Sequence, residues 1–115
     1  MPVNTLTADQ TDETFETNAD AKQHYFHSET VNAATGDWLI IPSGIGDVCL
    51  SVAPSSGSAR VEWTQATVED LETGSPQARP WDAGDVSTFT SAVMASVVTA
   101  VRCVSDGPTE FVVSA

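Results

Sequence analysis

From His24 onward the chain consists of short apolar runs that are separated by glycine, proline, asparagine, aspartate and serine. Such runs between turn residues are typical of β-strands, and several of them at close spacing predict an all-β domain. We therefore expect an antiparallel β-sandwich or barrel of about seven short strands. The predicted strands are Tyr25–Val31, Asp37–Ile41, Val48–Ala53, Ala59–Gln65, Val86–Thr90, Val97–Val104 and Glu110–Ser114.

Two turns predict how some of these strands connect. Apolar and polar side chains alternate in Val48–Ala53 and again in Ala59–Gln65, so each strand has one face suited to a core. We expect these two strands to form a hairpin over that core. Asp106-Gly107, followed by Pro108, predicts a second hairpin before the last strand.

Two segments depart from the strand pattern. Thr67 can cap the free N–H groups of a short helix, acidic residues follow it, and Gly74 can end it. These residues predict a single helical turn over residues 67–72. Ala92–Val101 is ambiguous because its valines also have helical spacing, but its β-branched residues favour a strand in the second half.

The first 23 residues have a different composition from the rest of the chain. They are rich in Thr, Asp, Glu, Asn and Gln, and their apolar residues Leu6 and Phe15 stand alone. Such a segment cannot bury enough apolar surface to fold by itself. We expect residues 24–115 to form the sandwich and residues 1–23 to form an extended polar N-terminal arm, which is either disordered or ordered on a neighbouring subunit.

Sixteen acidic residues against four basic ones give the chain a net charge of −12. Nucleic acids and anionic membranes both attract clusters of Lys and Arg, so neither is an expected partner. The charge suits solubility, surroundings rich in salt, or docking on a basic surface. The chain has neither a long apolar stretch nor an export signal at its start, so we expect synthesis in the cytosol.

The two cysteines, Cys49 and Cys103, each lie between apolar residues in a predicted strand. Because intracellular disulfides are uncommon, two buried and reduced thiols on neighbouring strands are the first expectation. A disulfide between them is the alternative.

No residue pattern predicts a catalytic or metal site. His24 and His27 would lie on opposite faces of a strand, which is wrong for one metal ion, although Glu29 is near and a loop would allow binding. Asp82–Asp85 is predicted to be a turn, with a calcium site as the alternative, and Gly44–Asp47 lacks the residues of a phosphate loop. We expect no metal, no cofactor and no enzymatic activity.

Three tryptophans are a high number for a chain of this length. Trp38 and Trp63 are predicted to lie in the core, where sandwiches commonly use large aromatic side chains. Trp81 is compatible both with the core and with an exposed anchor for a sugar or a protein. Leu6, Phe15 and Trp81 are therefore the candidate interface residues.

The second half of the chain contains five segments in a distinctive order, namely Ala59–Thr64, Val68–Leu71, Trp81–Val86, Thr99–Arg102 and Glu110–Val113. This order of a strand, a short acidic turn, a W-x-x-G-x-V segment and a closing T-A-x-R hairpin resembles small virion proteins of tailed bacteriophages. The resemblance covers about half of the chain. It implies a β-sandwich on a phage particle, of the capsid decoration (cement) type that binds the shell as a trimer, and it assigns no individual site residue.

The first functional expectation is a structural virion protein that is assembled in the host cytoplasm and binds a phage major capsid protein and further copies of itself. The alternative is a ligand- or carbohydrate-binding module that uses Trp81, such as a head-fibre or tail-associated receptor-binding domain. Copies that each carry −12 repel one another, so we expect self-association to strengthen as salt rises.

Overall fold

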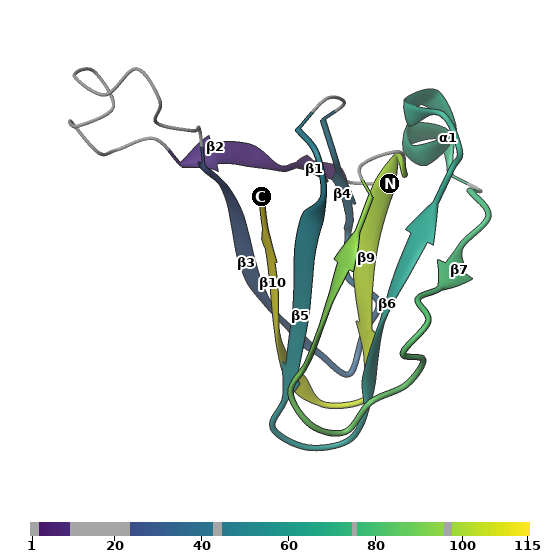
Figure 1. Cartoon of the computed structure of the whole chain (residues 1–115). Coiled ribbons are helices and arrows are strands. Elements are labelled where there is room, and N and C mark those ends of the chain that lie inside the picture. The colour runs from purple at the N-terminus through teal and green to yellow at the C-terminus, as the bar shows by residue number, and fades with distance from the viewer. Residues whose placement is uncertain (1–2, 10–23, 43–44, 75, 96–97) are drawn as a thin grey trace, which may run out of the picture.

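The computed structural model describes residues 3–9, 24–42, 45–74, 76–95 and 98–115, which form two five-stranded sheets packed face to face (Figure 1). The predicted antiparallel β-sandwich is confirmed, and the sheets do not close into a barrel. Sheet A contains, in spatial order, β1 (Val3–Thr5), β4 (Trp38–Ile40), β9 (Ala100–Ser105), β6 (Ala59–Thr64) and β7 (Arg79–Pro80).

All neighbouring strands of sheet B are antiparallel, whereas sheet A includes one parallel pair, β1 with β4. Sheet B contains, in spatial order, β2 (Thr7–Asp9), β3 (His24–Asn32), β10 (Pro108–Ser114), β5 (Val48–Pro54) and β8 (Thr90–Met94).

The core lies between the two sheets and follows from the alternation of each strand. In β5, Val48, Leu50 and Val52 are fully buried, while the residues between them are more exposed. Burial of apolar surface of this kind is the main stabilising contribution to the fold. The remaining buried members of this cluster are Leu6, Val31, Leu39, Ile41, Ala59, Val61, Trp81, Val98, Val101, Cys103, Phe111 and Val113.

Both predicted hairpins are wrong, because each turn carries the chain from one sheet to the other. β5 lies in sheet B and β6 in sheet A, and β9 and β10 are divided in the same way (Figure 1). The two resulting arches bond to each other. The N–H of Asp106 donates to the carbonyl of Ser58 over 2.8 Å, and the N–H of Ser55 donates to the carbonyl of Pro108 over 2.9 Å. The two strands of each arch therefore lie in opposite sheets and face each other across the core, instead of pairing edge to edge in one sheet.

Two of the predicted strands differ in the structure. Val86–Thr90 is not a strand, since only Val86 makes an isolated bridge, to Ala59, and the strand of this region is β8, which begins at Thr90. β9 begins at Ala100, later than predicted. The remaining predicted strands are confirmed to within about two residues at each end.

The predicted helical turn is confirmed as α1 (Val68–Thr73). The hydroxyl of Thr67 accepts a hydrogen bond from the N–H of Asp70 over 3.2 Å, and Gly74 ends the helix with φ at 114°. A left-handed residue of this kind at the end of a helix favours glycine. Within the residues that the structure describes, no helix is both long and apolar enough to span a bilayer.

The described N-terminal residues 3–9 contribute a short strand to each sheet. β1 pairs with β4 in sheet A, the chain then crosses, and β2 pairs with β3 in sheet B. Leu6 lies at the crossing and is only 1% exposed, and its N–H donates to the carbonyl of Ile40 over 2.9 Å. One apolar side chain placed between the sheets thus ties the segment to the core. Residues 10–23, including Phe15, lie outside the described part of the chain.

Candidate functional site

The outer face of sheet B is nearly free of charge. Its residues are those that alternate with the core residues of β3, β10, β5 and β8, and they point away from sheet A. Glu110 is the one charged residue among them. The described residues of this face are Phe26, Ser28, Thr30, Asn32, Cys49, Ser51, Ala53, Ser91, Val93, Pro108, Glu110, Val112 and Ser114.

The strand register sets these residues in rows across the sheet. One row runs from Phe26 on β3 through Ser114 and Cys49 to Val93 on β8. Phe26 is 42% exposed and Val93 is 69% exposed, so an apolar side chain reaches solvent at each end of the row. The next row has serine or valine on all four strands. The face therefore combines exposed apolar groups with small hydroxyls. Its low charge contrasts with the net charge of −12 of the whole chain.

The outer face of sheet A is different, because α1 covers part of it (Figure 1). Leu71 of α1 packs there with Trp38 and Ala100 in a second small apolar cluster. The guanidinium of Arg102 lies over the Trp38 ring at 4.3 Å from its centroid. Trp38 is fully buried, as predicted for a core tryptophan, but it lies outside the main core and not between the sheets.

A buried carboxylate joins β6 to β9 beside this cluster. Glu62 accepts from Arg102 at 2.8 Å and from Arg60 at 2.8 Å, and Arg60 also contacts Asp85 at 3.2 Å. Burial raises the pKa of Glu62, but the hydrogen bonds from the two guanidiniums outweigh it, so the net pKa lies below the ordinary value. Arg60 and Arg102 are therefore engaged within the chain and form no basic patch.

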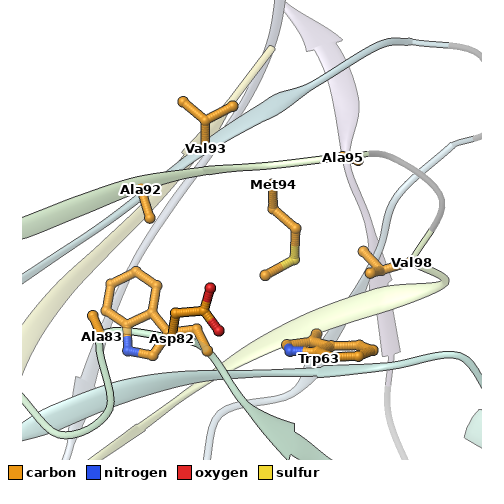
Figure 2. A pocket seen from close by; sticks show the side chains of 9 residues that line it. Trp63, Asp82, Ala83, Ala92, Val93, Met94, Ala95 and Val98 are labelled. Atoms are coloured by element: carbon orange, nitrogen blue, oxygen red, sulfur yellow. The ribbon is translucent and has the colours of Figure 1, made fainter.

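An apolar pocket of about 300 Å³ opens between β8 and the edge of sheet A. Figure 2 shows Ala92 and Met94 pointing from β8 to the side of the strand where Asp82 and Trp63 lie, whereas Val93 points to the other side. Asp82 brings one charge to its rim. Trp63 is only partly buried here, so the core is less complete at this edge of the sandwich than was predicted from the sequence.

Two of the three candidate interface residues are buried within the chain. Trp81 is 3% exposed, and its indole N–H donates to the carbonyl of Gly84 over 2.7 Å. That bond closes the W-x-x-G turn and sets the ring against the core. Leu6 is equally buried, and Phe15 lies outside the described residues. The side chains of Leu6 and Trp81 thus serve the core and offer little surface to another molecule.

His27 and Glu29 point into the sandwich from β3, and their side chains meet at 3.0 Å. The side chain of His24 and the residue Gly44 lie outside the described part. Among the described residues there is no group of three or more His, Cys, Asp and Glu that could hold a metal ion. Asp82 and Asp85 lie in the turn between β7 and β8, where Asp85 binds Arg60.

The cysteines have different environments, which corrects the prediction that both are buried on neighbouring strands. Both thiols are free. Cys103 faces the core, where burial, aided by the charge of Glu29, raises its pKa to about 12. Cys49 is exposed on the outer face of sheet B. They cannot pair, because they lie in different sheets and Cys49 points away from the core.

Sequence reasoning missed the outer face of sheet B and predicted single aromatic or apolar anchors instead. The signal was present, since uncharged residues occupy every second position of Phe26–Asn32 and Cys49–Ala53. Its meaning depended on which strands are neighbours. Comparison with protein-family models, with curated proteins and with solved structures found no match for this chain.

Proposed function

We propose that this chain is a structural virion protein of the capsid decoration type, which docks on a phage head through the outer face of sheet B and catalyses no reaction. The observation that carries the proposal is the near absence of charge on that face in a chain of net charge −12. Charged residues are depleted at the centres of protein interfaces, because burying an unpaired charge is costly. The resemblance to small phage virion proteins supplies the biological setting.

The acidic remainder of the molecule suits the same role. A strongly negative chain is steered toward a basic surface, such as a positively charged region of a major capsid protein, before the uncharged face makes contact. Arg60 and Arg102 are paired with Glu62 and Asp85, so these four groups add no net positive charge that would oppose the attraction. The expected partners are the major capsid protein and further copies of this chain, and a trimer remains a prediction from the resemblance.

The first experiment asks whether purified virions of the phage that encodes the chain contain it. Quantitative mass spectrometry of intact particles should find the chain in many copies per head, at a fixed ratio to the major capsid protein. Particles that lack the chain would contradict the proposed role.

The second experiment uses Cys49 to identify the contact surface. In the free chain a thiol reagent should modify exposed Cys49 quickly and buried Cys103 very slowly, because the thiolate is the reactive form. On heads that have rebound the chain, Cys49 should become protected. Equal labelling of Cys49 in the free and bound states would show that another surface makes the contact.

Two matched double variants complete this test. Ser28→Lys with Thr30→Lys adds two charges to the outer face of sheet B and should weaken binding to heads by at least roughly tenfold. Gln65→Lys with Gln77→Lys adds the same charge at exposed positions on the sheet A side and should leave binding unchanged. Equal effects of the two pairs would point to general electrostatics and not to this face.

The pocket beside β8 favours the ligand-binding module as a second candidate. Its apolar lining with Trp63 and Met94 suits a small apolar group. Stacking on a sugar is less well supported, because the ring of Trp81 is buried. Glycan-array binding that disappears in Trp63→Ala would favour this candidate, and an array without binding would weigh against its carbohydrate form.

A further inference from the structure

The four edges of the two sheets differ in how they are protected. β1 and β2 have three residues each, and β7 has two residues, one of which is Pro80. β8 has five residues and is the longest edge strand. An edge strand presents unpaired N–H and C=O groups, which natural proteins protect by shortness, proline, charge or a covering element. β1, β2 and β7 show such protection.

β8 shows none of these features. Its sequence Thr-Ser-Ala-Val-Met contains neither proline nor charge. It lies within Val86–Val101, a stretch that contains no charged residue at all in a chain with 20 of them, 16 acidic and four basic. Phe89 is 68% exposed and Val93 is 69% exposed. Among the described residues, the backbone of β8 is hydrogen-bonded only to β5, so no described strand pairs with its other edge.

We propose that β8 pairs with β8 of a second copy of this chain, antiparallel and across a two-fold axis, so that the B sheets of the two copies form one continuous sheet. This pairing builds on the proposed structural role, since it identifies the surface through which copies assemble. Centred on Ala92, it sets Ser91 of each copy opposite Val93 of the other and Thr90 opposite Met94.

Charge is the reason to choose a second copy as the occupant. Two molecules of net charge −12 approach each other at least electrostatic cost where few charges face each other, and β8 itself carries none, with Asp82 the one charge at the rim of the neighbouring pocket. β8 offers a basic partner no acidic group to pair with, so charge gives no reason to place such a partner at this edge. The pairing also brings Ala92 of the second copy beside the apolar pocket of the first, which is lined by Ala92 and Met94 of β8 (Figure 2). Backbone bonding and apolar burial then act at one site.

A continuous sheet would also enlarge the proposed docking face. Ser91 and Val93 belong both to β8 and to the outer face of sheet B. Joined at β8, two copies would present their uncharged faces side by side. A two-fold pair gives a dimer, whereas the resemblance implies a trimer, so molar mass distinguishes the two arrangements.

The test is the absolute molar mass of the intact chain by size exclusion with light scattering in high salt. The expected result is about 24 kDa, twice the chain mass of 12.1 kDa. Ser91→Lys with Val93→Lys sets two pairs of like charges across the axis and should return the chain to about 12 kDa, even though each copy becomes less negative. Ser28→Lys with Thr30→Lys, on the distant strand β3, should remain a dimer.

A cross-link provides a second measurement that does not depend on how well the lysine variant folds. Ala92→Cys in a Cys49→Ser background should give a covalent dimer on mild oxidation, since Ala92 lies on the axis, and Ser28→Cys in the same background should not. A monomer at all concentrations, a trimer, or a dimer unaffected by the lysines at 91 and 93 would overturn β8 pairing. The proposed function is tested separately. That test asks whether the chain binds to heads and whether Ser28→Lys with Thr30→Lys weakens this binding.

Discussion

Gly107 lies where the two arches of the sandwich touch. A Cβ atom at this position would stand 2.6 Å from the carbonyl oxygen of Ser56, which is closer than non-bonded atoms approach. We expect Gly107→Ala to lower the free energy of unfolding by about 2 kcal/mol, because one arch must move away from the other. Urea denaturation followed by tryptophan fluorescence measures the loss.

Gly46 provides the control at the same scale. Its φ is +85°, but a Cβ there would meet no atom within 4 Å, so Gly46→Ala tests the cost of backbone conformation alone. That cost should be about 1 kcal/mol. If Gly46→Ala were as destabilising as Gly107→Ala, contact between the arches would not explain the need for glycine at 107.

Glu62 links two elements, since it lies on β6 and binds Arg102 on β9. Glu62→Gln should lower the free energy of unfolding at pH 7 by about 3 kcal/mol, because two guanidiniums lose their buried partner. The folded-state pKa of Glu62 lies below its ordinary value of 4.5, so its contribution is fully present well above pH 4.5 and is lost as pH falls through the folded pKa.

Acid titration of stability checks this directly. The unfolding free energy of the unmodified chain should fall more steeply below about pH 4.5 than that of Glu62→Gln. Glu110→Gln, which removes an exposed acid from β10, should leave both the stability at pH 7 and the acid dependence nearly unchanged. Parallel acid curves for the unmodified chain and Glu62→Gln would contradict the assigned role.

The whole molecule carries −12, so its assembly should depend on salt. Raising sodium chloride from about 0.05 M to about 1 M shortens the Debye length from more than 10 Å to about 3 Å. The dissociation constant of the dimer should then fall by roughly tenfold, because repulsion between copies is screened while the β8 contact is uncharged. Sedimentation equilibrium at several salt concentrations measures this, and tighter association at low salt would show that charged groups hold the copies together.

Much of the fold could be predicted from local sequence, because the features involved act over a few residues. The alternation in β5 determines which face is buried, and Thr67 and Gly74 determine where α1 begins and ends. The deficit of basic residues predicts that nucleic acid is not a partner. The spacing of turn residues predicts a sandwich or a barrel, and only the structure chooses the sandwich.

Only the tertiary structure decided which strands are neighbours. Ser55–Ser58 and Asp106-Gly107 show where the chain bends, but a bend is equally compatible with a hairpin and with an arch between sheets, and contacts far apart in sequence select the arch. The arrangement of the two sheets also places Leu6 and Trp81 in the core. The register of sheet B places Phe26 and Val93 in one row of its outer face. A face and an edge are properties of neighbouring strands, so no single segment could reveal the proposed docking face or the edge of β8 that no described strand pairs with.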